Sequence, residues 1–148
     1  MYPKDKRTIQ ILLVEDNPGD VRLTQETFRE VKLPTHLHVV SDGVAALSFL
    51  HRQAPYQDAP RPDIILLDLN LPRKDGREVL AEIKQDPSLK RIPVLVLTTS
   101  KAEEDIIHSY NLHANCYISK PVDLNDFIHT IQTMNSFWLS IATLPPAF

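Results

Sequence analysis

The chain has 148 residues, the usual size of one domain with a single well-formed core. Its 16 basic and 19 acidic residues give a net charge of −3, which argues against a nucleic-acid or anionic-membrane partner. The sequence has no apolar run long enough to span a membrane, its first residues lack the apolar stretch of a signal peptide, and its one cysteine is Cys116. We therefore expect a cytoplasmic protein without an internal disulfide.

Five short apolar runs alternate along the chain with segments of helical periodicity. Within these runs, apolar residues hardly alternate with polar ones, which is typical of parallel strands covered on both faces. The expected strands are Ile9–Val14, His36–Val40, Asp63–Leu67, Pro93–Leu97 and Cys116–Ile118.

Helices are expected in the gaps between the strands. The first should begin near Pro18, a favoured first-turn residue. Its buried residues are expected to be Val21, Thr24, Phe28 and Val31. The other helices are expected at 43–52, from 76 to just before Pro87, at 101–112 and from about 123 to 134. The one that begins at 76 should face inward with Val79, Leu80 and Ile83. The stretch 51–62 contains three prolines and is predicted to be a surface loop.

These strand–helix units predict an α/β fold, a doubly wound five-stranded parallel sheet with helices on both faces. In such a sheet, ligands bind beyond the carboxyl ends of the strands, where the strand order switches. Polar residues stand at four of these ends: Glu15 and Asp16 after the first strand, Asp68 after the third, Thr98 after the fourth and Lys120 after the fifth. The sequence therefore predicts one assembled site.

Three carboxylates at one site repel one another unless a cation lies among them. Mg²⁺ prefers oxygen ligands, typically carboxylates, carbonyls, water and a phosphoryl oxygen. One or both of Glu15 and Asp16 would hold the ion, directly or through water. Asp68 would add an oxygen, and Asn70 could contribute its backbone carbonyl.

The polar residues after the fourth and fifth strands suit the binding of a phosphoryl group. Thr98 offers a hydroxyl and Lys120 an ammonium group to the phosphoryl oxygens. The set favours Asp68 as a nucleophile that accepts a phosphoryl group and forms an acyl phosphate. Mg²⁺ and Lys120 would neutralise the charge that develops.

Each residue also has a simpler structural interpretation. Glu15 and Asp16 could cap the first helix, and Asp68 could be a turn residue. Thr98 could be an ordinary loop hydroxyl, and Lys120 a solvated loop charge. Their joint placement at strand ends favours the site.

This pattern resembles the receiver domain of two-component response regulators, a (βα)5 flavodoxin-like fold. Asp68 precedes Thr98 by 30 positions, and Thr98 precedes Lys120 by 22, which are the usual intervals of that family. The resemblance covers about residues 8–135 of a single receiver domain at 1–148, with a C-terminal extension at 136–148. The stretches 68–84, 91–100 and 136–139 look like the small response regulators of cyanobacterial phytochromes.

The resemblance implies a signalling phosphoacceptor that catalyses only its own phosphorylation and dephosphorylation. A sensor histidine kinase, here of the phytochrome type, would supply the phosphoryl group, and altered protein contacts would carry the signal. The implied Mg²⁺ ligands are Asp16, Asp68 and the Asn70 carbonyl, with Glu15 acting mainly through water.

The resemblance also implies a two-state switch next to the site. Thr98 would turn toward the phosphoryl oxygens, and Tyr117 would repack inward behind it. The bond between Lys120 and Pro121 would be cis, as in that family.

Phe137, Trp138 and Leu139 offer more apolar surface than one helical face can bury. They could fold back onto the same core, but we favour a symmetric homodimer. Three other functions are compatible with parts of the pattern: an unphosphorylated scaffold receiver, a phosphohydrolase with an aspartate nucleophile, and a flavin or nucleotide carrier. Such hydrolases usually place a second acid where this chain has Asn70, and the carrier lacks a glycine-rich phosphate loop.

Overall fold

The fold is built on a five-stranded parallel sheet with the order β2-β1-β3-β4-β5. The structure, a computed structural model, describes residues 8–30, 34–98, 116–119 and 125. The strands are β1 (Ile9–Val14), β2 (Thr35–Val40), β3 (Ile64–Asp68), β4 (Val94–Thr98) and β5 (Cys116–Ser119). Each strand lies within one residue of its expected bounds. The predicted doubly wound sheet is therefore confirmed, with a switch in strand order between β1 and β3.

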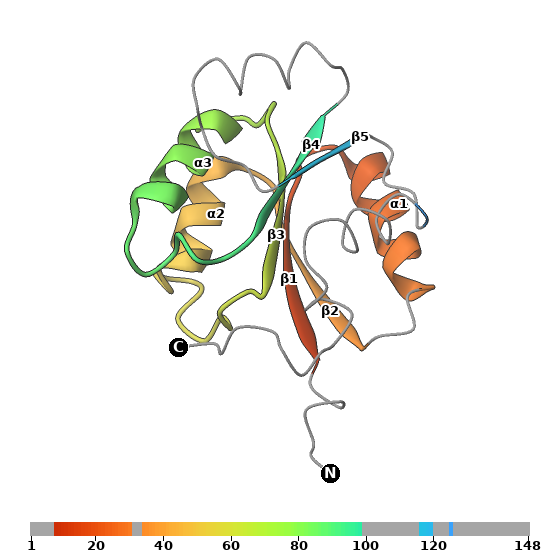
Figure 1. Ribbon diagram of the computed structural model, residues 1–148, viewed down its shortest axis with the longest axis horizontal. Coiled ribbons are helices and arrows are strands. Elements are labelled where there is room, and N and C mark those ends of the chain that lie inside the picture. The colour runs from red at the N-terminus through yellow and green to blue at the C-terminus, as the bar shows by residue number, and fades with distance from the viewer. Residues whose placement is uncertain (1–7, 31–33, 99–115, 120–124, 126–148) are drawn as a thin grey trace.

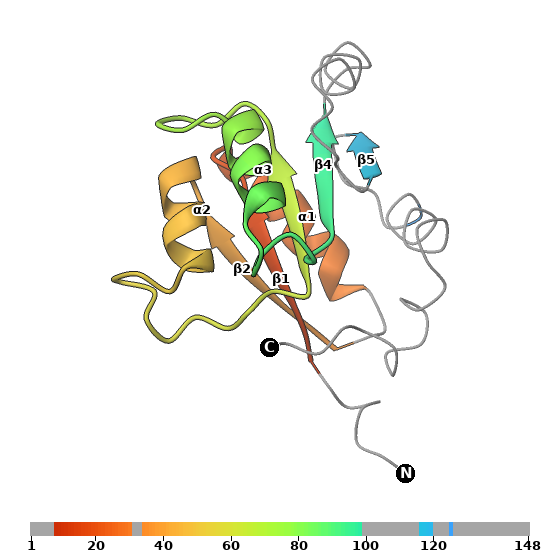
Figure 2. The same cartoon turned by 60° about the vertical axis from the view of Figure 1, so that its left-hand side comes forward.

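Three helices lie in the described residues, on both faces of the sheet. They are α1 (Pro18–Arg29), α2 (Gly43–Leu50) and α3 (Gly76–Gln85). Helices α2 and α3 cover one face, and α1 covers the other (Figures 1 and 2). The helices expected at 101–112 and 123–134 lie outside the described residues.

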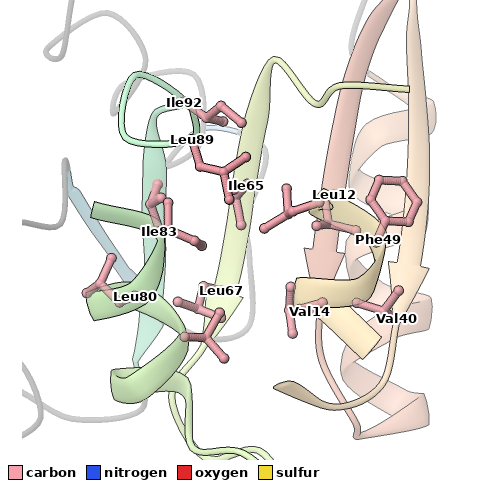
Figure 3. Packing of buried hydrophobic residues seen from close by; sticks show 14 of the residues in the cluster. Leu12, Val14, Val40, Phe49, Ile65, Leu67, Leu80, Ile83, Leu89 and Ile92 are labelled. Atoms are coloured by element: carbon pink, nitrogen blue, oxygen red, sulfur yellow. The ribbon is translucent and has the colours of Figure 1, made fainter. Parts of the chain in front are cut away.

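The main described core lies between the sheet and the α2–α3 layer. Side chains from β1 and β3 meet side chains from both helices there (Figure 3). The inward face expected for α3 is confirmed, because Val79, Leu80 and Ile83 are fully buried. The continuous apolar runs of β1, β3 and β4 are buried on both faces, as expected for central parallel strands.

The buried face of α1 differs from the expected one. Thr24 and Phe28 are buried as predicted, but Val21 is only half-buried and Thr27 is buried instead. The hydroxyls of Thr24 and Thr27 donate to the carbonyls of Asp20 and Leu23, at 2.8 and 3.0 Å. Because these bonds satisfy the hydroxyls within the helix, both threonines can be buried at little cost. The expected Val31 contact lies outside the described residues.

Helix α2 ends at Leu50, two residues before its expected end. Arg52 has a φ of 54°, a left-handed conformation that cannot continue a right-handed helix. The stretch 51–62 then forms the predicted surface loop. The Arg61 side chain ties this loop to the segment before β4, where it donates to the Ser88 carbonyl at 2.6 Å.

The imidazole of His38 on β2 gives the fold a predicted pH dependence. Partial burial, and then the neighbouring charge of His36, lower the pKa of His38 below its ordinary value of 6.5. The His38 imidazole therefore binds a proton more readily in the unfolded chain than in the folded one. Its contribution to the free energy of unfolding is lost as the pH falls below about 6.5. We expect the urea midpoint of the wild type to fall between about pH 8 and pH 5 by more than that of His38→Gln. Equal losses in the two proteins would contradict this prediction.

Candidate functional site

Three carboxylates converge at the carboxyl edge of the sheet, at the switch in strand order. Glu15 and Asp16 directly follow β1, and Asp68 is the last residue of β3. The parallel register pairs Val14 with Leu67, so the residues that follow them lie side by side. One ligand oxygen from each acid lies within 4.8 Å of the other two. The structure thus brings together the three acids that the sequence predicted to be neighbours.

The β1–α1 turn fixes the two acids that follow β1. The backbone amide of Glu15 donates to the Val40 carbonyl of β2 at 3.0 Å. Glu15 is 1% exposed, and its carboxylate accepts the backbone N–H of Asn17 at 3.2 Å. The N-cap of α1 is Asn17, whose side chain accepts from Gly19 and Asp20. The alternative that Glu15 or Asp16 is the N-cap of α1 is therefore wrong.

Asp68 is held by both its side chain and its main chain. The residue is 3% exposed, and its Oδ1 accepts the backbone N–H of Asn70 at 3.3 Å. This bond is the turn contact that the simpler interpretation of Asp68 predicted, and it coexists with the acidic cluster. Asn70 itself is exposed at the start of the β3–α3 loop.

Helix α3 begins directly over the main chain of Asp68. Asp75 caps it in a capping box with Glu78, and the Gly76 N–H donates to the Leu69 carbonyl at 3.0 Å. A Cβ on Gly76 would lie 2.3 Å from the Asp68 carbonyl oxygen. Only glycine permits so close an approach, so the start of α3 positions the backbone of Asp68.

The β3–α3 loop is also braced from α2, a contact that the sequence reasoning missed. A Cβ on Gly43 would lie 2.2 Å from the Lys74 carbonyl oxygen. Asp42 caps α2 through the Ala45 N–H, and its carboxylate lies 3.8 Å from Nη1 of Arg73, which has a φ of 66°. The only local signal is the Asp-Gly pair after β2, which is typical of many turns.

The donor set of the cluster fits a hard divalent cation. It consists of carboxylate oxygens, two of them on buried side chains, and it contains no nitrogen or sulfur. Buried carboxylates that face one another are costly unless a positive charge compensates them. Mg²⁺ and similar ions take such oxygen ligands and keep several waters, for which the exposed Asp16 leaves access.

The remaining predicted site residues are described only in part. Thr98 ends β4, and the register pairs Leu97 with Asp68 and Thr98 with Ser119. Its backbone therefore lies at the same edge of the sheet as the cluster. The other predicted groups lie outside the described part of the chain: the side chains of Thr98 and Tyr117, and all of Lys120, Pro121, Phe137, Trp138 and Leu139.

Comparison with known proteins identifies this arrangement. Residues 11–132 match the model of the response regulator receiver domain. The chain belongs to this receiver family. It is 56% identical over 137 residues to the response regulator Rcp1 of Synechocystis sp., with 93% of each chain covered.

Solved structures of two similar receivers agree with the match. The Mn²⁺-bound form of Rcp1 is 55% identical, with a TM-score of 0.75 over 93% of this chain and 99% of that chain. The phosphorylated cyanobacterial phytochrome response regulator RcpA is 54% identical, with a TM-score of 0.78 over 95% of this chain and all of that one. The predicted flavodoxin-like receiver fold and the likeness to phytochrome response regulators are confirmed.

Membership in the family settles the broad class of function. This receiver is a two-component signalling protein, its partner class is the sensor histidine kinase, and its acidic cluster is of the kind that holds a divalent cation. The family match favours this function over the carrier and hydrolase interpretations. Among the described helices, none is long and apolar enough to cross a membrane.

Proposed function

We propose that Asp68 accepts a phosphoryl group from a phytochrome-type sensor histidine kinase in a Mg²⁺-dependent reaction. The observation that carries the proposal is the convergence of Glu15, Asp16 and Asp68, whose ligand oxygens lie within 4.8 Å of one another. The similarity to RcpA, of which a phosphorylated structure exists, supports it. The phosphorylated receiver would then signal through altered protein contacts.

The Asp68 carboxylate attacks the phosphorus atom of the phosphoryl group carried by the kinase. The bond between that phosphorus atom and the kinase breaks, and an acyl phosphate forms on the aspartate. Asp16, Asp68 and the Asn70 carbonyl would hold Mg²⁺, with Glu15 acting mainly through water. Bound Mg²⁺ supplies positive charge for the phosphoryl oxygens. The buried position of Asp68 and its bond to the Asn70 N–H hold the attacking carboxylate in one orientation.

The chain would stabilise the phosphoryl group with two further residues. Lys120 places an ammonium beside the phosphoryl oxygens, and Thr98 donates its hydroxyl to one of them. The turn of Thr98 would leave space for Tyr117 to repack inward. A local charge event would in this way bias a two-state element at the β4–β5 edge of the sheet.

The Mg²⁺ requirement tests this function directly. We expect acetyl phosphate with Mg²⁺ to add one phosphate to the chain, detected by intact mass, and to add none when EDTA replaces Mg²⁺. Hydroxylamine should remove the phosphate, because it cleaves acyl phosphates and leaves phosphoserine intact. Phosphate that forms in EDTA or survives hydroxylamine would contradict the proposal. No uptake under either condition would favour the scaffold receiver instead.

We also propose that the chain is one cytoplasmic receiver domain that forms a homodimer through the segment after residue 135. Phe137, Trp138 and Leu139 supply the apolar surface for this contact. Truncation before Ser136 is expected to give a folded monomer with a lower sedimentation coefficient than that of the full chain. An oligomeric state unchanged by truncation, with the far-ultraviolet circular dichroism preserved, would refute the dimer interface.

A further inference from the structure

Two histidines stand side by side on the edge strand of the sheet, away from the acidic cluster. His36 and His38 are two positions apart in β2, so their side chains leave the same face of the strand. Their ring centroids are 4.1 Å apart, and the ring planes are inclined by 31°. Among the described strands, β2 pairs only with β1, and His36 is exposed. The exposed His36 and the half-buried His38 thus place two nitrogen-bearing rings side by side.

A hydrogen bond to β1 sets the tautomer of His38. Its Nε2 lies 2.7 Å from Oε1 of Gln10, and an amide oxygen can only accept. Nε2 therefore carries the hydrogen, and the lone pair remains on Nδ1. Gln10 is itself anchored, because its backbone N–H donates to the buried Asp63 carboxylate at 2.8 Å. Histidines that bind metals commonly donate their second ring N–H to an oxygen in this way.

The protein side of the pair is closed by aromatic rings. The ring centroid of Phe49, on α2, lies 5.4 Å from that of His38. The ring centroid of Tyr56 lies 5.5 Å from that of Phe49. Phe49 lies over the β1–β2 side of the core (Figure 3). This packing limits the rotamers of His38, so less side-chain entropy is lost when an ion binds.

We propose that His36 and His38 chelate one transition-metal ion of the Zn²⁺, Ni²⁺ or Cu²⁺ class on the outer edge of β2. Imidazole suits these ions, whereas Mg²⁺ prefers oxygen. At metal–nitrogen bonds of about 2.1 Å, two neighbouring ligand nitrogens lie about 3 Å apart. Because the ring centroids are 4.1 Å apart and the planes are inclined by 31°, binding requires the exposed His36 ring to turn its donor nitrogen toward that of His38. Water fills the remaining positions.

The chelate is distinct from the acidic cluster in both place and chemistry. The register pairs His36 with Gln10 and His38 with Leu12, so Glu15 lies five and three residues further along β1, about 16 and 10 Å at the usual rise of a strand. An ion on the histidine pair therefore does not share ligands with an ion among the carboxylates. The two sites would separate hard from borderline divalent ions.

Calorimetric titration of the full chain with Ni²⁺, in excess Mg²⁺ to fill the acidic cluster, tests the chelate. We expect one Ni²⁺ site in the wild type and at least about tenfold weaker binding in His36→Gln and in His38→Gln. Gln10→Ala should also weaken binding by about tenfold or more, and Gln10→Glu should retain it, because only the latter keeps an acceptor for Nε2. The urea midpoint of each variant without metal checks that it is folded.

Two matched variants decide whether the ion binds elsewhere. His51→Gln removes a different exposed imidazole, and Asp16→Asn weakens the acidic cluster; both should leave Ni²⁺ affinity unchanged. In the same excess Mg²⁺, Ni²⁺ should also raise the urea midpoint of the wild type by more than that of His36→Gln, because the folded strand holds the two rings together. Equal Ni²⁺ affinity in the wild type and His36→Gln, or lost affinity in Asp16→Asn, would overturn the proposal.

Discussion

The Asp68→Asn variant is expected to take up no phosphate from acetyl phosphate and Mg²⁺, whereas the wild type gains one phosphate per chain. The asparagine amide is neutral and a poor nucleophile. It also lacks the negative charge that makes a carboxylate a good ligand for a cation. Asparagine has nearly the same shape as aspartate, so the buried position at the end of β3 remains filled. The measurement is intact mass after equal incubation of both proteins.

Asp63→Asn is the matched control for this variant. Asp63 is also a buried acid, 6% exposed against 3% for Asp68, but it lies just before β3, at the opposite end of the strand. Its side chain accepts the Gln10 N–H, which an asparagine oxygen can still do. We expect Asp63→Asn to be phosphorylated as the wild type is. Phosphate on Asp68→Asn would place the acceptor on another residue.

Asp68→Asn should also change stability in a direction that a structural aspartate would not. Glu15, Asp16 and Asp68 repel one another without a cation, so loss of one charge is expected to raise the urea midpoint in EDTA. Saturating Mg²⁺ should stabilise the wild type more than the variant, because the wild type binds the ion better. A lower midpoint for the variant in EDTA would contradict the proposed repulsion.

Gly76→Ala is expected to lower the free energy of unfolding by about 1–3 kcal/mol. This loss is expected even though alanine has a higher helix propensity than glycine. The new Cβ would meet three backbone atoms, the nearest being the Asp68 carbonyl oxygen at 2.3 Å. Backbone atoms cannot turn aside as a flexible side chain can. Either α3 or the end of β3 must shift, so phosphate uptake should slow as well. Urea unfolding and the rate of phosphorylation measure the two effects.

Gly19→Ala provides the comparison within the same protein. Gly19 is an exposed residue in the first turn of α1, and its added Cβ would meet only the Asn17 side chain, at 3.2 Å. We expect a change in the free energy of unfolding within about 1 kcal/mol and an unchanged phosphorylation rate. Equal urea midpoints for wild type and Gly76→Ala would contradict the prediction, because they would show that the start of α3 can shift without a loss of stability.

Local sequence patterns were sufficient to predict the parallel sheet and the proximity of Glu15, Asp16 and Asp68. The continuous apolar run before Asp68 and the one before Glu15 indicated buried parallel strands, because such strands have no solvent face to mark with polar residues. The carboxyl ends of parallel strands share one edge, so residues that end two strands must be neighbours once the strands pair. The inward face of α3 followed from its helical period.

The tertiary structure alone decided how these residues are held. How the Glu15 and Asp16 side chains lie beside Asp68 depends on the path of the β1–α1 turn and on the pairing of β1 with β3. The close approach of Gly76 to Asp68, and the pairing of His36 with His38 beside Gln10, arise from strand register and helix placement. Periodicity shows which face of an element is buried, but contacts between elements distant in sequence exist only after the chain has packed.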